Sequence, residues 1–286
     1  MHQGVSGHPA KRMGRESCHP QGRLPLLPPG CAHNLLHREK DRAPCVSACP
    51  AGINVQGYVQ LIGQGKYREA IELIRQRMPL PGILGRVCPH PCEEKCRRSE
   101  VDSPVAIRDL KRFAADQVDI KALPRPVISE RPEKVAIIGS GPGGLSAAYF
   151  LRLAGFSVTI FEKLSVLGGM LKVGIPDYRL PAAVLDKEIE AILDLGVKVE
   201  TNKALGKDYS LKDLEEKGFA AVLLAIGAHG GADMGIPGEK DCENVINAVD
   251  FLREINLGSR KKPGDRVAII GGGNVAIDAA RMAQRL

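Results

Sequence analysis

The chain has 286 residues, of which 44% are hydrophobic and 4% are aromatic, and its formal net charge is +7. No apolar run approaches the roughly 18 residues that a membrane helix needs, so we expect no membrane partner. The positive charge lies in the N-terminal part, where residues 1–131 contain 21 Lys and Arg against 13 Asp and Glu. No nucleic-acid motif or aromatic interleaving accompanies it, which favours an acidic protein or an anionic cofactor over nucleic acid.

The N-terminal part divides into three stretches by composition. Residues 1–40 are rich in Pro, Gly, His and Arg without an apolar period, which predicts an unstructured or extraneous leader. Apolar residues at helical spacing follow and predict a small helical domain over residues 41–122. One of its helices is expected over 104–118, where Pro104 can open it. The proline-rich residues 123–133 predict a linker.

Beyond the linker, short apolar runs alternate with helical periods, which is typical of βαβ units and a parallel sheet. The predicted fold class is therefore α/β, with a helical domain in front. Strands are expected at residues 135–138, 157–162, 197–201, 220–227 and 266–270, and helices at 145–155, 182–196 and 247–255.

A glycine pattern, G-x-G-x-x-G, lies between the first expected strand and helix, at Gly139, Gly141 and Gly144. The first glycine permits the turn, the second lets a pyrophosphate approach the backbone, and the third brings helix against strand. The helix N-terminus then holds the anion. Glu162 ends the second strand, where an acid binds the adenosine ribose. The pattern predicts a dinucleotide site.

The same pattern returns 132 residues later, with Gly271, Gly273 and Ala276 in the three places. Two such turns imply two nucleotides, usually a flavin and a nicotinamide, because a flavin accepts a hydride and returns single electrons. Gly168 and Gly169 would let a second loop close over a flavin diphosphate, so FAD is assigned to the first turn. The second is assigned to NADPH or NADH. The choice between the two stays open, because the residue that would discriminate them falls at position 294, beyond the last residue.

Five of the eight cysteines form two groups, and they are Cys45, Cys49, Cys88, Cys92 and Cys96. The groups read C-x3-C-P and C-x3-C-x3-C, and thiolates on two loops can hold a 4Fe–4S cluster. Structural zinc prefers C-x2-C spacing, so zinc is the weaker alternative and unligated thiols the weakest. Cysteines without a signal peptide favour a reducing, cytoplasmic setting over disulfides.

Prolines also shape the expectation for the second cysteine group. Pro89 and Pro91 exclude a helix from Cys88 to Cys92, which places these ligands on a loop. Cys92 and Cys96 are expected to share the first turn of a helix. The remaining cysteines, expected to be incidental, are Cys18, Cys31 and Cys242.

Six stretches, in this order, resemble the small (beta) subunit of NADPH-dependent glutamate synthase and its relatives, over about residues 43–286. Those relatives include the N-terminal half of dihydropyrimidine dehydrogenase and the NADPH-binding subunit of electron-bifurcating ferredoxin reductases. The stretches are "APCVSACPAGINVQGYV", "GRVCPHPCEEKCRR", "PVAIRDLKRFAAD", "GSGPGGLSAAYFLRLAGFSVTIFEK", "GGMLKVGIPDYRLP" and "IGGGNVAIDAAR".

The resemblance implies a helical iron–sulfur domain followed by a Rossmann-type FAD domain over residues 134–245, and an inserted NAD(P)-binding Rossmann domain that starts at residue 246. Hydride would pass from NAD(P)H to FAD, and single electrons through a 4Fe–4S cluster to a redox partner protein, in that family the glutamate synthase large subunit. No side chain need act as a catalytic acid or base. The resemblance adds further residues to the flavin region, and these are Ile175, Pro176, Tyr178, Arg179 and Gly227.

The chain departs from the family in two respects. The cysteines that two-cluster relatives carry before C-x3-C-P are missing, so one cluster is expected, and which four of the five cysteines ligate it stays open. The family also continues beyond Leu286, so both nucleotide domains are expected to be incomplete. Two alternatives therefore stand beside the first hypothesis: an electron-input module for a ferredoxin, hydrogenase or formate dehydrogenase partner, and an inactive, truncated fragment.

Overall fold

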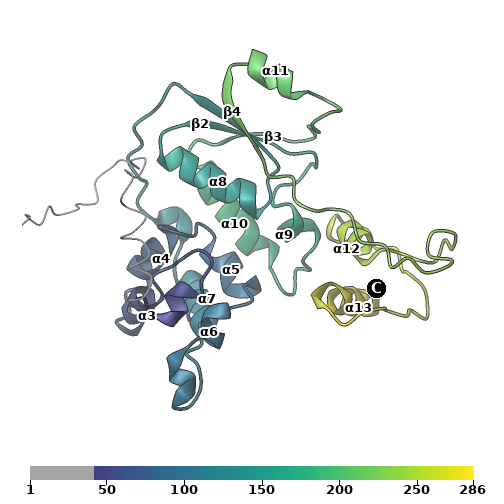
Figure 1. Ribbon diagram of the computed structural model, residues 1–286, viewed down its shortest axis with the longest axis horizontal. Coiled ribbons are helices and arrows are strands. Elements are labelled where there is room, and N and C mark those ends of the chain that lie inside the picture. Colours follow the sequence, from purple (N-terminus) through teal and green to yellow (C-terminus); the bar gives the residue numbers. More distant parts are fainter. Residues whose placement is uncertain (1–41) are drawn as a thin grey trace, which may run out of the picture. The chain divides into compact units, whose positions relative to one another are not determined.

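The computed structural model describes residues 42–286, and residues 43–286 form one compact unit (Figure 1). The leader predicted over residues 1–40, with Cys18 and Cys31, lies outside the described residues. Within the described part of the chain, no helix combines the length and apolar composition that crossing a membrane requires.

Short helices make up the part of the chain before the sheet. They are α2 (Pro44–Ser47), α3 (Val55–Gly63), α4 (Tyr67–Arg75), α5 (Pro81–Val87), α6 (Pro91–Glu94) and α7 (Ile107–Gln117), with 3₁₀ turns η1 (Arg97–Glu100) and η2 (Ile120–Ala122). Most of their apolar faces meet in one core, in which Tyr58, Ile71 and Ile74 are fully buried, whereas Ile83 of α5 is buried in the core of the sheet domain. Burial of such a shared face, more than intrinsic propensity, stabilises helices this short.

The helix expected from Pro104 begins three residues later, at Ile107, so that boundary was wrong. A tertiary contact explains the start. The carboxylate of Glu93, on α6, accepts a hydrogen bond of 2.7 Å from the backbone N–H of Arg108. The first N–H groups of a helix lack partners within the helix, and here a remote side chain satisfies one of them.

A four-stranded parallel sheet follows, with the strand order β3-β2-β1-β4. This is the order in which a dinucleotide-binding sheet begins. The strands are β1 (Lys134–Ile138), β2 (Ser157–Phe161), β3 (Lys198–Glu200) and β4 (Phe219–Leu224), and the intervening helices are α8 (Pro142–Leu153), α9 (Met170–Val173), α10 (Ala182–Leu193) and α11 (Leu211–Glu216). Four of the five expected strands are confirmed, together with the helices between them.

Alternate residues of the central strands face opposite sides of the sheet, as the pleat requires. Ile137 and Ile160 pack with the residues of α8 and α10, while Ile138 and Phe161 pack with Leu214 of α11. In Figure 1, α8 and α10 lie between the sheet and the helices α3–α7. Both faces of the central strands are therefore covered.

The C-terminal stretch contributes α12 (Ala248–Asn256) and α13 (Asn274–Arg285), which share a small core around Phe251 and Leu252. The strand expected at residues 266–270 does not form, and Ile270 is exposed. A strand is stabilised by the hydrogen bonds of a neighbouring strand, and no strand in the described part of the chain pairs with this segment.

Candidate functional site

The first glycine turn, residues 139–144, joins β1 to α8 and has one open position. A Cβ atom on Gly144 would lie 2.0 Å from the carbonyl oxygen of Gly139, and one on Gly139 would lie 2.4 Å from that of Ala225. Gly139 also has φ of +107°, which side chains rarely adopt. A Cβ on Gly141 would meet nothing within 4 Å. Gly139 and Gly144 thus serve backbone packing, while Gly141 leaves space at the N-terminus of α8.

Glu162, directly after β2, is buried and holds the turn from within. One carboxylate oxygen accepts hydrogen bonds from the backbone N–H and the hydroxyl of Ser140, at 2.9 and 2.6 Å. The other accepts one from the N–H of Leu164, at 2.9 Å. A carboxylate has about four acceptor positions, so roughly one remains for a ribose hydroxyl. Glu162 therefore lies where an acid is expected and also tightens the glycine turn.

Gly168 and Gly169 form a loop, the diglycine loop, that lies directly against the first glycine turn. The N–H of Gly168 donates to the carbonyl oxygen and the hydroxyl of Ser140, at 3.1 and 3.2 Å. A Cβ on Gly169 would come within 2.8 Å of the Cα of Gly141. Only glycine permits this approach, so the two backbones form one wall beside the open position.

These residues fit the diphosphate of a dinucleotide. The N-terminus of the 12-residue helix α8 has N–H groups without helical partners, and no side chain caps it. Cβ atoms on Gly141 and Gly143 would meet nothing within 4 Å. An anion is stabilised at such a helix end by hydrogen bonds and by the helix dipole. We keep FAD, the group expected here, as the proposed occupant.

Arg179, expected near the flavin, contacts the C-terminal helix. Its guanidinium pairs with the carboxylate of Asp278 on α13, and the Tyr178 hydroxyl donates to the same carboxylate at 2.7 Å. The guanidinium groups of Arg281 and Arg285 lie 4.5 and 4.3 Å from the centre of the Tyr178 ring. This loop thus joins the sheet domain to the helix that follows the second turn.

Gly227, also expected at the flavin site, follows a strand that ends beside the first turn. The N–H of Ala225 donates to the carbonyl of Ile138 at 2.8 Å, which brings the end of β4 beside the turn. Gly227, two residues later, has φ of +65° and open space around its Cβ position. This open position would let a ligand approach the backbone, and the role of Gly227 at the flavin stays a prediction.

The second glycine turn, residues 271–276, keeps the glycine conformation without the packing. Gly271 has φ of +115°, close to that of Gly139, yet its nearest neighbour is the Cβ of Ala276 at 3.6 Å. Gly273 is exposed and open on all sides. Its assignment to NAD(P)H stays a prediction that rests on the repeated motif.

The five cysteines lie near one another, since Cys49 and Cys96 act on the pKa of Cys45, and Cys49 and Cys88 on that of Cys92; we call them the thiol cluster. Cys92 is buried, and Cys45 and Cys49 pack partly buried against the same core. Cys88 caps the C-terminus of α5 and lies outside any helix, as expected. Cys92 lies within α6, because Pro91 starts a helix at its first position, where its missing N–H is not needed. The expectations that Cys92 lies on a loop and that it shares a helical turn with Cys96 were therefore wrong.

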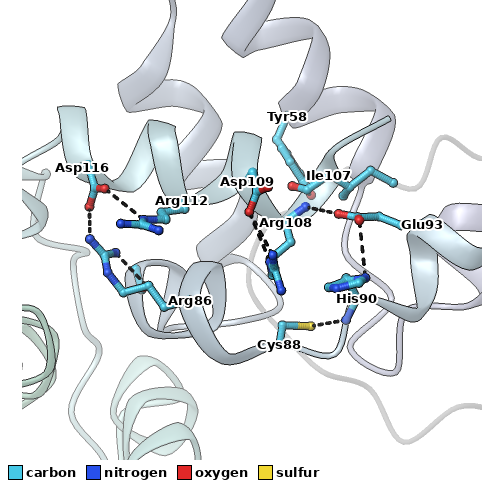
Figure 2. A network of polar contacts seen from close by, with 11 residues as sticks. Tyr58, Arg86, Cys88, His90, Glu93, Ile107, Arg108, Asp109, Arg112 and Asp116 are labelled. Carbon is cyan, nitrogen blue, oxygen red and sulfur yellow. Dashed lines mark hydrogen bonds and ion pairs between the residues drawn. The ribbon is translucent and has the colours of Figure 1, made fainter. Parts of the chain in front are cut away.

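A polar network links the thiol cluster to α7 (Figure 2). His90 adopts a left-handed conformation, φ 48°, and its N–H donates to the sulfur of Cys88 at 3.4 Å. Its Nδ1 lies 3.4 Å from the carboxylate of Glu93, which also accepts the N–H of Arg108. The loop between Cys88 and Cys92 is therefore tied to the start of α7 before any metal binds.

A buried lysine lies close to the thiol cluster. Burial, with Cys49 and Cys88 close by, raises the pKa of Cys92 to about 11, so its thiol is protonated at neutral pH. Lys111 of α7 is only 5% exposed, and its burial lowers its pKa while Cys88 and Cys49 act against that shift. Ligation of a metal centre would release the thiol protons, and the ammonium group would then face thiolate charge.

The donor set fits an iron–sulfur cluster. Thiolates are the usual protein ligands of such clusters, and here they come from two chain segments beside the buried Lys111. Among the described residues, no group of three or more His, Cys, Asp or Glu side chains is arranged to hold a metal ion. Cys242, by contrast, is exposed in the segment between β4 and α12.

Comparison with known proteins assigns both parts of the chain. Residues 39–122 match a family model described as dihydropyrimidine dehydrogenase domain II, 4Fe–4S cluster. Residues 133–286, more than half of the chain, match the model for pyridine nucleotide-disulphide oxidoreductases. The chain belongs to the pyridine nucleotide-disulphide oxidoreductase family. The predicted fold class is thereby confirmed, as is the cofactor set of FAD, NAD(P)H and a 4Fe–4S cluster, in preference to zinc.

Three curated relatives of the chain are named as subunits. The chain is 46% identical over 280 residues to the NADP(+)-dependent formate dehydrogenase subunit beta of Moorella thermoacetica, covering 89% of the chain and 39% of the relative. It is 43% identical over 263 residues to the NADPH-Fe(3+) oxidoreductase subunit beta of Geobacter sulfurreducens, covering 90% and 39%. It is 38% identical over 275 residues to the NAD-dependent dihydropyrimidine dehydrogenase subunit PreT of Salmonella typhimurium, covering 91% and 65%. The chain thus spans about two fifths of the first two relatives.

Sequence reasoning missed several residues of the oxidoreductase site. Lys111 lies at helical spacing from Ile107 and Ala114 on the apolar face of α7, and a charge on that face was a usable signal. Ser140 stands inside the glycine pattern at a place where any residue is allowed. Glu188 of α10 gave no local signal, because its carboxylate accepts a hydrogen bond from the N–H of Gly82, about a hundred residues earlier in the chain.

Proposed function

We propose that this chain is the NAD(P)H-oxidising part of an electron-transfer oxidoreductase that uses FAD and one 4Fe–4S cluster to deliver electrons to a partner protein. The observation that carries the proposal is that one compact unit, residues 43–286, holds both the thiol cluster and an open glycine turn. When bound, the flavin supplies hydride acceptance and single-electron return. A reducing, cytoplasmic setting is part of the proposal, because thiolate ligands must stay reduced to bind a cluster.

The chain's own residues would act by binding and by electrostatics. The N–H groups at the start of α8 and the backbone of the diglycine loop would bind the diphosphate, and Glu162 one ribose hydroxyl. Lys111 would offset the negative charge of the thiolate-bound cluster. No side chain is assigned as an acid or base.

The test is anaerobic reconstitution with FAD, iron and sulfide, followed by addition of NADPH or NADH. We expect the visible flavin band to bleach and a paramagnetic signal of a reduced cluster to appear. Gly141→Val, at the open position, should abolish FAD retention and leave the cluster in place. The double variant Cys88→Ser, Cys92→Ser, which removes at least one ligand whichever four cysteines bind, should do the reverse. A flavin that stays oxidised with both dinucleotides would refute the proposal.

Serine substitution of each cysteine of the thiol cluster identifies the ligands. Four of the five single variants should lose iron and one should retain it, because a cubane takes four thiolates. Retention of iron in all five would contradict a cluster at this place. Iron content per chain and visible absorbance provide the measurement.

Two kinds of partner protein could receive the electrons. The motif resemblance favours a glutamate synthase large subunit, which would connect the chain to glutamate synthesis. The relatives named as beta subunits of an NADP(+)-dependent formate dehydrogenase and of an NADPH-Fe(3+) oxidoreductase support an electron-input module about as well.

NADPH-driven glutamate formation with an active large subunit would favour the first partner. Formate-dependent reduction of NADP(+) with a formate dehydrogenase catalytic subunit, or reduction of ferric iron, would favour the second. Failure with an active large subunit removes the glutamate synthase hypothesis and leaves the electron-transfer proposal in place.

A further inference from the structure

Helix α5 connects the two halves of the unit. It precedes the linker in sequence, yet Leu80 and Ile83 are buried in the core of the sheet domain, while Leu84 packs against the core of the helical domain. Its last residue, Val87, is followed directly by Cys88, the first member of the second cysteine group. Val87 also packs against the sheet-domain core, so the helix contacts that domain from its first turn to its last residue and ends directly at the thiol cluster.

Glu188 of α10 anchors the first end. Its carboxylate oxygens accept hydrogen bonds from the backbone N–H groups of Gly82 and Ile83, at 2.6 and 3.0 Å. The side chain is buried, with the residue 4% exposed, and it comes from 105 residues away in the chain. A carboxylate that receives two N–H groups at a helix start satisfies donors that have no partner within the helix.

Two glycines of α5 let this helix approach elements on both sides. A Cβ on Gly82 would lie 3.0 Å from the Glu188 carboxylate, and one on Gly85 would lie 2.7 Å from the Cα of Arg112 on α7. Figure 2 shows another contact between α5 and α7, in which the Arg86 guanidinium donates to Asp116 at 2.7 Å. Glycine within a helix costs about 1 kcal/mol against alanine, and the close packing offsets that cost.

Helix α10 extends the connection to the proposed flavin site. Leu185 and Ile189, on either side of Glu188 along the helix, belong to the sheet-domain core. A Cβ on Gly168 would contact both of their side chains, at 3.5 and 3.4 Å. The diglycine loop, α10, Glu188, α5 and Cys88 are thus successive neighbours.

We propose that Glu188 is a positioning residue for electron transfer: by anchoring α5, it holds Cys88 and the loop that follows at a set place relative to the flavin domain. The inference rests on the proposed function, because it assumes FAD beside the diglycine loop and a cluster on the thiols. A single anchor at this point has leverage because electron transfer depends steeply on the distance between the centres.

Charge at Glu188 gives the anchor a dependence on pH. Burial raises its pKa to about 7, although its two N–H bonds and the guanidinium groups of Arg75 and Arg86 act against that shift. Asp116 of α7 and Lys187 of α10 are the other charged residues that line the cavity beside it. A pKa raised in the closed form means that the closed form binds the proton more tightly. Opening of α5 should therefore become easier as pH rises from about 4.5 to 7, and stay constant above.

Amide hydrogen exchange of the full chain tests the anchor without any cofactor. Glu188→Ala should speed exchange of the amides of residues 82–88 by about tenfold or more, because two buried N–H groups lose their acceptor. Glu188→Gln, which keeps one acceptor and folds if the alanine variant does not, should remove the pH dependence of opening, measured as exchange corrected for the intrinsic rise of amide exchange with pH. The control is Glu190→Gln, on the same helix as Glu188. It removes the charge from an exposed ion pair with Lys121 and should change exchange less than about twofold.

The cofactor-loaded chain tests the consequence. Glu188→Ala should keep wild-type iron content, the wild-type paramagnetic signal and wild-type flavin reduction by NADPH, while electrons reach the cluster from the flavin about tenfold more slowly. Wild-type exchange at residues 82–88 in the Glu188→Ala variant would overturn the proposal, and so would faster exchange with unchanged transfer. If the wild-type flavin is not reduced at all, the proposed function fails, and the exchange result still decides whether Glu188 anchors α5.

Discussion

The two glycine turns of this chain have almost the same sequence and very different surroundings. The first lies between a paired strand and a covered helix, and backbone atoms crowd two of its three glycines. The second, 132 residues later, follows a segment that pairs with no strand among the described residues, and its glycines are exposed. The same motif can therefore be a packed structural element or an open turn, and its neighbours decide which.

The largest difference is expected for the first glycine of each turn. Gly139→Ala adds a Cβ at 2.4 Å from a backbone oxygen, at a positive φ, and should lower the free energy of unfolding by roughly 3 kcal/mol or more. Gly271→Ala meets only the strain of its φ and should cost about 1–2 kcal/mol. Urea unfolding followed by circular dichroism measures both. Equal losses would show that strain dominates in both turns.

The third position provides the next largest contrast. Gly144→Ala places a Cβ 2.0 Å from the carbonyl oxygen of Gly139 and should cost about 2–3 kcal/mol as α8 moves away from β1. Its counterpart, Ala276→Gly, only loses helix propensity, about 1 kcal/mol or less. Thermal unfolding of the two variants provides the comparison. A tolerated Gly144→Ala would mean that the helix and strand are not in contact in solution.

Ser140 and Gly272 occupy the same place in the two turns. Ser140→Gly removes the hydroxyl that bonds Glu162 and Gly168, and should cost roughly 2 kcal/mol because a buried carboxylate loses a donor. Gly272→Ser adds a side chain in open space and should change stability by less than about 0.5 kcal/mol. The unfolding midpoint in urea, at unchanged slope, measures each effect. A neutral Ser140→Gly would argue against a tightened first turn.

The smallest effect on stability is expected at the second glycine. Gly141→Ala and Gly273→Ala both add a methyl group where no atom lies within 4 Å, so each should change stability by less than about 0.5 kcal/mol. Only Gly141→Ala should weaken FAD retention after gel filtration, because its methyl group would occupy the space for the diphosphate. Loss of FAD in the Gly273 variant instead would exchange the two nucleotide assignments.

Much of the sheet domain was predictable because its determinants are local. The apolar runs that became β1 and β2, the glycines of the first turn and Glu162 are all read within about thirty residues. The strand expected at 266–270 failed for the opposite reason, because an apolar run becomes a strand only when another strand supplies hydrogen bonds. The cysteine groups were recognised from spacing, but the helix that contains Cys92 and the start of α7 depend on contacts across the helical domain.

By itself, the sequence determined the order of an iron–sulfur domain and a dinucleotide-binding domain, since the spacing of thiols and glycines is chemically specific. Only the tertiary structure decided which of two like turns is packed and where the buried charges lie. Lys111 and Glu188 belong to none of the sequence motifs, and their roles follow from the residues that surround them in the fold. The physical reason is that desolvation and close backbone approach arise between segments far apart in the chain, as where Glu188 meets the start of α5.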